Sequence, residues 1–252
     1  MNPLEHCIIP DWPAPAQVKA IQTTRQGGVS IAPYDSLNLG SHVGDNPLAV
    51  ERNRILLNKL LPSEPVWLEQ THGTLVADAD RASCQPQACP EHSRRTDACI
   101  ARHRESVCAV MTADCLPVLL CDAQGSVVGA VHAGWRGLRD GVIEATVLAM
   151  GVAPQSLMAW LGPAISQEAF EVGDEVRAAF VAVQPQAASA FIAGQPGKWF
   201  ADIYALARLR LNALGVTQIY GGGHCTYRER EQFFSYRRDG VTGRMGTFIW
   251  LT

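Results

Sequence analysis

Residues 108–137 read CAVMTADCLPVLLCDAQGSVVGAVHAGWRG, and this segment sets the architecture that we expect. It contains three apolar runs of strand length, at 108–111, 117–121 and 127–131. Three neighbouring strands are therefore predicted. Cys115 lies just before the second run and His132 just after the third, so both side chains are expected at strand ends.

Patterns typical of helices and strands alternate on both sides of this segment. Further strands are predicted at 18–24, 66–70, 74–77, 157–161, 218–220 and 247–251. Helices are predicted from the Asn46-Pro47 cap to Pro62 and at 136–150, 171–183 and 202–214. Because no internal repeat or linker interrupts this mixture, we expect one α/β domain with a mixed sheet over residues 1–252. An exposed, aperiodic loop is predicted at about 81–95.

Length and composition are those of an ordinary globular protein. The 252 residues are 47% hydrophobic and 18% charged, which is enough for a sizeable core. The 21 basic and 24 acidic residues give a formal charge of −3, so no nucleic-acid partner is expected. The start lacks a signal-peptide pattern, and no apolar run approaches the roughly 18 residues of a membrane span. We therefore expect a cytoplasmic protein without a membrane partner.

The eight cysteines are interpreted as thiols, because the chain is too long for a small disulfide-stapled domain. Cys115, His132 and His72, the last in a Gln-Thr-His-Gly turn, are candidate metal ligands. Cysteine thiolate and neutral imidazole are ligands that zinc prefers. Three protein ligands leave a fourth position for water or substrate, as in catalytic zinc sites.

The same residues also fit other roles. A histidine beside glycine in a turn is commonly a simple loop residue, and an isolated cysteine is commonly buried packing. Cys115 also fits a thiolate nucleophile with His132 or His72 as its base. If Cys225 completed a Cys2His2 set, the zinc would be structural.

Several segments together resemble the YfiH-like family, and the resemblance extends from about residue 18 to residue 251. They are Thr-Arg-Gln-Gly-Gly-Val-Ser at 24–30, Ser-Leu-Asn-Leu-Gly at 36–40, the His72 turn, 112–117, 131–137, Phe-Phe-Ser-Tyr-Arg-Arg at 233–238 and Thr-Gly-Arg at 242–244. Members of this family have been described as multicopper polyphenol oxidases or laccases and, alternatively, as purine nucleoside phosphorylases.

The resemblance implies a single α/β domain of the layered α-β-β-α type and a zinc ion held by His72, Cys115 and His132. It further implies phosphorolysis of adenosine, inosine, guanosine and methylthioadenosine to a free base and a ribose 1-phosphate. Hydrolytic deamination of adenosine to inosine is implied as well. The expected partners are therefore a small-molecule nucleoside and phosphate.

Phosphorolysis requires a group that binds phosphate. Arg25 beside a Gly-Gly loop, Asn38 and Arg136 can supply guanidinium or backbone donors, although each arginine also fits a solvated surface position. Asp114 is interpreted as a residue that orients a zinc ligand, acts as a base or caps the local turn. Cys225 belongs to a Cys-Thr pair that resembles the family pattern, so we expect it near the site.

Multicopper chemistry is not expected. Four coppers require about ten histidine ligands, typically in His-X-His pairs, whereas this chain has seven histidines and no such pair. The spacing of Cys84, Cys89 and His92 fits no standard zinc module, so flexible decoration is predicted for their loop. The alternative enzyme is a cytoplasmic amidase that edits peptidoglycan precursors, with Cys115 as zinc ligand or nucleophile.

Overall fold

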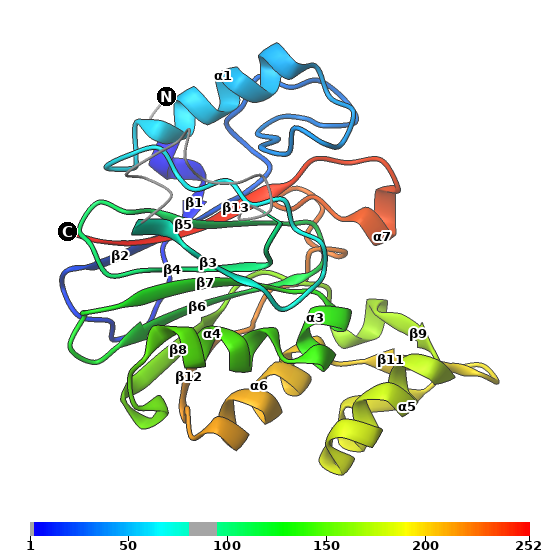
Figure 1. Ribbon diagram of the computed structural model, residues 1–252. Coiled ribbons are helices and arrows are strands. Elements are labelled where there is room, and N and C mark those ends of the chain that lie inside the picture. Colours follow the sequence, from blue (N-terminus) through cyan, green and yellow to red (C-terminus); the bar gives the residue numbers. More distant parts are fainter. Residues whose placement is uncertain (1–2, 81–94) are drawn as a thin grey trace.

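The protein is described by a computed structural model that places residues 3–80 and 95–252. The loop predicted at about 81–95 therefore lies almost entirely outside the described residues, as do Cys84, Cys89 and His92. Two sheets stacked face to face form the centre of the molecule, and helices cover their outer faces (Figure 1). This arrangement confirms the expected layered α-β-β-α fold.

The larger sheet has six strands in the order β12-β8-β6-β7-β4-β3. Its strands are β12 (Gln218–Gly221), β8 (Leu157–Leu161), β6 (Leu116–Asp122), β7 (Val128–Ala133), β4 (Ala98–Ala101) and β3 (Val76–Asp78). β12 is parallel to β8 and β3 is parallel to β4, whereas the other pairs are antiparallel. The sheet is therefore mixed, as predicted.

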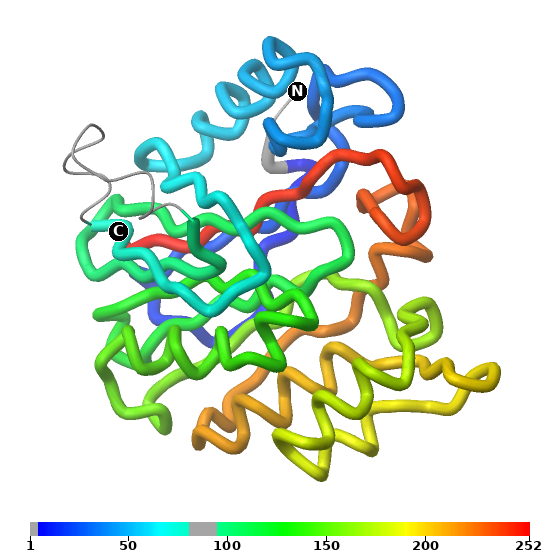
Figure 2. The backbone as a smooth tube through the Cα atoms, turned by 45° about the vertical axis from the view of Figure 1, so that its right-hand side comes forward, coloured from blue at the N-terminus to red at the C-terminus, as the bar shows by residue number. Residues whose placement is uncertain are grey.

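The second sheet has four antiparallel strands in the order β1-β2-β13-β5. Its strands are β1 (Cys7–Ile8), β2 (Val18–Thr23), β13 (Met245–Leu251) and β5 (Cys108–Thr112). A small antiparallel sheet, together with α5 (Asp174–Val183), projects from one end of the two-sheet body (Figure 2). Its strands are β10 (Phe191–Ala193), β11 (Lys198–Ala201) and β9 (Glu171–Gly173).

Helices complete the layers. The other α-helices that lie wholly within the described residues are α1 (Pro47–Asn58), α3 (Trp135–Asp140), α4 (Val142–Met150), α6 (Ile203–Leu214) and α7 (Tyr236–Asp239). Short 3-10 turns lie at Pro3–His6, Pro154–Ser156, Gln167–Ala169 and Pro185–Ala190. α1 covers the four-stranded sheet, whereas α4 and α6 cover the six-stranded sheet (Figure 1). No helix within the described ranges is long and apolar enough to cross a membrane.

The central apolar core lies between the two sheets. Val110 and Ile249 of the four-stranded sheet belong to one cluster with Leu119 and Val128 of the six-stranded sheet, and each is at most 1% exposed. Burying a side chain of this size stabilises the fold by about 1.5–3 kcal/mol. This packing holds β6 and β7 firmly and so fixes the loops at their ends.

Two predicted helices are shorter than expected. The segment 136–150 is split at Gly141, whose φ of +103° suits glycine and ends α3 before α4 begins. The segment 171–183 begins as strand β9, and its helix starts only at Asp174, where two acidic residues occupy the first turn. Hydrophobic periodicity alone did not show either boundary.

The predicted strand at 66–70 is wrong, because this segment makes only an isolated bridge between Val66 and Cys108. The side chain of Gln70 makes the hydrogen bonds that a paired strand would otherwise make with β5. The amide of Gln70 donates to the carbonyl oxygen of Met111 and accepts from its N–H, both at 2.7 Å. The edge of β5 is therefore satisfied there without a further strand.

Candidate active site and metal centre

The pairing of β6 with β7 brings Cys115 and His132 together. The strands are antiparallel, with Leu116 opposite Ala133 and Pro117 opposite His132. Cys115 immediately precedes β6, and His132 is the penultimate residue of β7. Both side chains therefore lie at the same end of the sheet, at strand ends as predicted.

His72 reaches this sheet end from a turn built around one buried carboxylate. Asp97, immediately before β4, is fully buried and accepts hydrogen bonds from the backbone N–H of His72 at 2.8 Å and of Gly73 at 2.7 Å. The N–H and hydroxyl of Thr71 also donate to it, each at 3.1 Å. These bonds hold His72 at a φ of +61°, which is uncommon for residues other than glycine.

Asp97 also orients His132. Nδ1 of His132 donates to Oδ1 of Asp97 at 2.8 Å, and the His132 backbone N–H donates to the Asp97 carbonyl oxygen at 2.7 Å. Because Nδ1 is engaged, Nε2 remains as the ligand atom of the ring. A carboxylate behind a ligand histidine fixes its tautomer and orientation.

The spacing of the three ligand atoms fits a metal ion. The donor atoms of His72, Cys115 and His132 all lie within 4.8 Å of one another, and Nε2 of His72 is 3.7 Å from the Cys115 sulfur. Ordinary zinc bond lengths and a tetrahedral angle place such a nitrogen and sulfur about 3.5 Å apart. A Cβ on Gly134 would come within 2.6 Å of the His72 ring and 3.2 Å of that sulfur, so glycine keeps the space open.

The charges at this site favour a thiolate. Burial alone raises the pKa of the Cys115 thiol, but His132 and His72 outweigh it and lower this pKa to about 6. Burial lowers the pKa of His132, but Cys115 and Asp97 outweigh it and raise this pKa to about 9. Burial raises the pKa of Asp97, but the hydrogen bonds from His132 and the backbone lower it to about 2. Cys115 is therefore ionised at neutral pH, the form that binds a metal or acts as a nucleophile.

A cavity of about 340 Å³ opens beside the three candidate ligands, large enough for a small molecule. The other residues that line it are His42, Gln70, Met111, Thr112, Ala113, Tyr236 and Arg244. The amide of Gln70 is occupied by the backbone of Met111. The other polar side chains of the lining are those of His42, Thr112, Tyr236 and Arg244, and the Thr112 hydroxyl is buried without a hydrogen-bond partner among the described residues.

Asp114 shapes the loop rather than facing the ligands. Its carboxylate accepts hydrogen bonds from the hydroxyl of Thr226 and the backbone N–H of Arg237, each at 2.6 Å, and it is 9% exposed. Its φ is +91°, so these bonds hold a backbone conformation that is uncommon for aspartate. Of the roles predicted for Asp114, these contacts support the cap, and they fix the residue next to Cys115.

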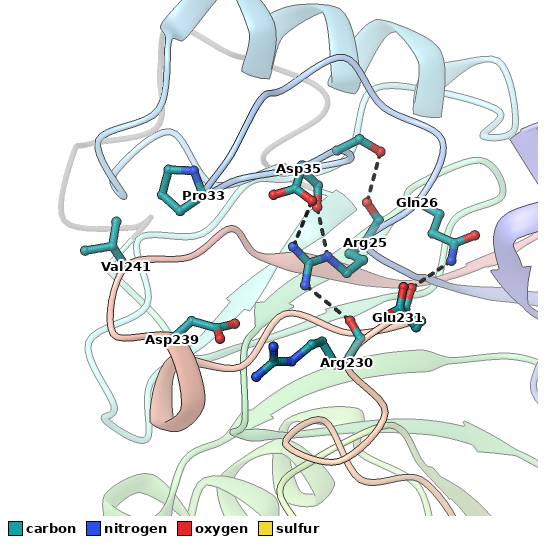
Figure 3. A pocket seen from close by; sticks show the side chains of 9 residues that line it. Arg25, Gln26, Pro33, Asp35, Arg230, Glu231, Asp239 and Val241 are labelled. Atoms are coloured by element: carbon teal, nitrogen blue, oxygen red, sulfur yellow. Dashed lines mark hydrogen bonds and ion pairs between the residues drawn. The ribbon is translucent and has the colours of Figure 1, made fainter.

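The structure places Arg25 in a different cavity, of about 510 Å³ (Figure 3). Its guanidinium donates to the carbonyl oxygens of Asp35 at 2.8 Å and Arg230 at 3.2 Å, and it forms an ion pair with the Asp35 carboxylate at 3.2 Å. It also lies over the ring of Phe234. Arg25 thus ties the 25–36 loop to the C-terminal segment.

The other predicted substrate ligands do not line the metal-site cavity either. Arg136 is exposed in the first turn of α3, with its guanidinium over the ring of Trp135. Cys225 lines a third cavity, where the Ser166 hydroxyl contacts its sulfur at 2.9 Å, and the three-ligand cluster does not include it. Asn38 is buried and acts indirectly, because its side-chain oxygen accepts from the N–H of Arg244 at 2.9 Å.

Several residues of the site were not predicted as site residues, among them Arg244, Tyr236, His42 and Asp97. Arg244 and Tyr236 belong to the Thr-Gly-Arg and Phe-Phe-Ser-Tyr-Arg-Arg segments, so a signal for them was present. His42 and Asp97 stand in no recognisable motif. Asp97 belongs to the site because it holds the turn at 71–73, and His42 belongs to it because it lines the same cavity as the three candidate ligands. Both relations depend on contacts between segments that are distant in the sequence.

The fold and the site together define a mixed α/β protein with a candidate transition-metal centre open to a cavity. The chain belongs to the family described as multi-copper polyphenol oxidoreductase laccase, whose model matches residues 19–252. That description names copper, yet the seven histidines of this chain fall short of a four-copper ligand set.

Relatives with names of a different kind cover nearly the whole chain. "Purine nucleoside phosphorylase YfiH" of Escherichia coli is 57% identical over 247 residues, which are 97% of this chain and 98% of that protein. "Purine nucleoside phosphorylase PA4543" of Pseudomonas aeruginosa is 53% identical over 245 residues, again 97% and 98% of the two chains.

Solved structures agree with the fold. The crystal structure of Neisseria meningitidis protein NMB0706 matches with a TM-score of 0.92 and 53% identity, covering 98% of this chain and 99% of that one. The crystal structure of YlmD from Geobacillus stearothermophilus matches with a TM-score of 0.84 and 32% identity, covering 94% and 92%.

Proposed function

We propose that the protein is a zinc-dependent purine nucleoside phosphorylase. The observation that carries this proposal is the cluster of His72, Cys115 and His132, which opens onto a cavity that also holds the Arg244 guanidinium. The names of the Escherichia coli and Pseudomonas aeruginosa relatives supply the reaction class. The proposed substrates are adenosine, inosine, guanosine and methylthioadenosine, each with phosphate.

The reaction transfers a ribosyl group to phosphate. A phosphate oxygen forms a bond to C1′ of the ribose, and the bond between C1′ and N9 of the purine breaks. The electron pair of that bond leaves with the purine, which takes up the proton that hydrogen phosphate loses. The products are a free base and a ribose 1-phosphate.

The donor set suits zinc, because one thiolate and two imidazoles are ligands that this ion prefers. His72, Cys115 and His132 would hold the ion, and when bound it supplies a Lewis acid that stabilises developing negative charge. Asp97 keeps His132 oriented and the His72 turn in place. Tyr236, which is 59% exposed, lines the cavity and offers its ring for a purine to stack on.

A second activity, hydrolytic deamination of adenosine, is part of this proposal. Water replaces the amino group on the purine ring, and inosine and ammonia are the products. No phosphate takes part. The two reactions of adenosine are therefore separable by their dependence on phosphate, although they use the same metal site.

The proposal is tested by following adenosine, adenine and inosine chromatographically across a phosphate titration. Adenine release is expected to rise with phosphate and to reach zero without it, whereas inosine release is expected to be independent of phosphate. If the zinc-loaded protein releases neither product at any phosphate concentration, the phosphorylase proposal is wrong.

One observation favours a second candidate, the amidase. Cys115, His132 and Asp97 form a thiolate–imidazolium–carboxylate array of the kind found around an activated cysteine nucleophile. A muramoyl amino-acid nucleotide assayed beside adenosine distinguishes the two candidates. Amide hydrolysis without nucleoside turnover would replace the phosphorylase with the amidase, whether or not zinc is required.

A further inference from the structure

Arg244 immediately precedes β13, and hydrogen bonds hold its backbone N–H, its carbonyl oxygen and one nitrogen of its guanidinium. Its backbone N–H donates to the Asn38 side-chain oxygen at 2.9 Å, and its carbonyl oxygen accepts from the N–H of Leu39 at 3.1 Å. One guanidinium nitrogen donates to the carbonyl oxygens of Thr242 at 3.1 Å and Gly243 at 3.0 Å. The guanidinium plane is thus set by the backbone before any ligand arrives.

The rest of the guanidinium faces the cavity without a protein acceptor. Among the described residues, no carboxylate forms an ion pair with Arg244, and Nε and the second terminal nitrogen donate to none of them. Burial lowers the pKa of Arg244, while the Cys115 and Asp114 anions oppose this, and an arginine remains charged in any case. A half-buried guanidinium that keeps free donors and forms no ion pair with a carboxylate favours an anion.

The surroundings leave room for Arg244 and for an anion beside it. A Cβ on Gly40 would lie 2.8 Å from Cγ of Arg244, so only glycine lets this side chain pass. The ring of Tyr236 lies 5.9 Å from the guanidinium carbon, and His42 lines the same cavity. Both can donate a hydrogen bond to an oxyanion.

Two other arginines, Arg25 and Arg54, do not offer free donors to this cavity. Arg25 is paired with Asp35 and with backbone carbonyls. Arg54 donates from two nitrogens to the carbonyl oxygen of Leu39 and lies over the Trp67 ring. Neither lines the cavity at the three-ligand cluster.

We propose that Arg244, with His42 and Tyr236 beside it, forms an oxyanion subsite that binds inorganic phosphate next to the His72–Cys115–His132 cluster. The identity of this phosphate as the cosubstrate rests on the proposed phosphorylase function. The subsite itself rests on the free donors of Arg244. A planar guanidinium presents two parallel donors to a phosphate, so arginine here is not interchangeable with lysine.

The first test compares phosphate KM values of zinc-loaded wild type, Arg244→Gln, Arg244→Lys and Arg104→Gln. Loss of charge-assisted hydrogen bonds is expected to raise the phosphate KM of Arg244→Gln about 10- to 100-fold. Arg244→Lys should fall between it and wild type, while the nucleoside KM stays nearly unchanged. Arg104→Gln is the matched control, because Arg104 is exposed and pairs with Leu251 at the opposite end of β13.

Zinc content and thermal melting show whether Arg244→Gln is folded and loaded. If it does not fold, Gly40→Ala tests the same site, because its Cβ displaces the Arg244 side chain. Gly40→Ala is then expected to raise the phosphate KM, and an unchanged value would overturn the subsite.

Direct titration of the zinc-loaded protein with inorganic phosphate, by calorimetry without nucleoside, separates this inference from the proposed function. Phosphate binding that Arg244→Gln abolishes, in a protein that does not cleave adenosine, would support the subsite and refute the phosphorylase. Phosphorolysis with the same phosphate KM in wild type and folded Arg244→Gln would overturn the subsite and leave the phosphorylase standing.

Discussion

Two cavities flank the segment between residues 230 and 244, and both are lined by arginine side chains. The larger, of about 510 Å³, surrounds Arg25, and the smaller, of about 340 Å³, contains the three candidate ligands and Arg244. Arg25 is held by a carboxylate and two carbonyl oxygens (Figure 3), whereas Arg244 uses one nitrogen and keeps the others free. The larger cavity is also lined by Arg230, whose guanidinium donates to no described residue but is exposed to solvent, whereas Arg244 is half-buried beside the candidate ligands. The difference teaches that a half-buried guanidinium with free donors, and not volume, distinguishes the candidate binding cavity.

The largest effect is expected at the cluster in the smaller cavity. Cys115→Ser, His132→Ala and His72→Ala should each abolish nucleoside turnover, because each removes one of three candidate ligands. The fold should survive, since a chain of this size has a core of its own. Assays of turnover, zinc content and circular dichroism check this. Global unfolding of all three variants would indicate a structural metal instead.

The next largest effect, on zinc affinity, is expected at Asp97, whose carboxylate holds His132 and the His72 turn. Asp97→Asn should lower zinc affinity about 10- to 100-fold, because such outer carboxylates orient and polarise ligand histidines. Competition with a chromophoric chelator measures the affinity. Asp122→Asn is the matched control, since that carboxylate accepts from backbone N–H groups at the end of β6 far from Cys115. An equal loss of affinity in both variants would contradict the role given to Asp97.

In the larger cavity the expected effect is on stability alone. Arg25→Gln should lower the free energy of unfolding by about 1–3 kcal/mol, because it removes charge-assisted bonds to Asp35 and Arg230. Denaturant unfolding measures this change, and the phosphate KM should stay near the wild-type value. A rise in phosphate KM as large as that of Arg244→Gln would move the phosphate site to this cavity.

The smallest effect is expected far from both cavities. Asp122, at the end of β6 opposite Cys115, accepts hydrogen bonds from the backbone N–H of Ser126 and Val127 and from the Ser126 hydroxyl. Burial raises its pKa, but these bonds outweigh it and hold the pKa below the usual 3.8. Asp122→Asn should therefore cost about 1–2 kcal/mol of stability and leave turnover unchanged.

The pH dependence of this effect has a defined sign. Because the folded pKa of Asp122 is lowered, its stabilisation is present above pH 3.8 and is lost as the pH falls through the lower folded value. The difference in unfolding free energy between wild type and Asp122→Asn should thus be constant at neutral pH and shrink below pH 3.8. A difference that grows on acidification would refute this.

Local patterns were sufficient for much of the fold. The predicted strand 157–161 coincides with β8, and the helix predicted at 202–214 matches α6, which has Asp202 as its N-cap and Gly215 as its C-cap. Hydrophobic periodicity failed to predict a helix boundary where the conformation of one residue determines it. Gly141 breaks the 136–150 helix by a positive φ, which the apolar spacing around it does not reveal.

The candidate site was predictable only in part, for a similar reason. Cys115 precedes one apolar run and His132 follows the next, so their places at strand ends were predictable from local sequence. Asp97 acts through hydrogen bonds to a turn 24–26 residues earlier in the chain and to His132, and Arg244 enters the cavity from the segment just before the last strand. Long-range contacts of this kind leave no period or spacing in the sequence.

The central claim is that one zinc ion at His72, Cys115 and His132 is required for phosphorolysis. The most direct measurement is elemental analysis and phosphate-dependent adenine release on the same sample, before chelation, after it and after stepwise return of zinc. Activity is predicted to vanish with the metal and to return in proportion to zinc, reaching its maximum at about one ion per chain. Full activity in the metal-free protein, or recovery only with about four copper ions per chain, would contradict the account.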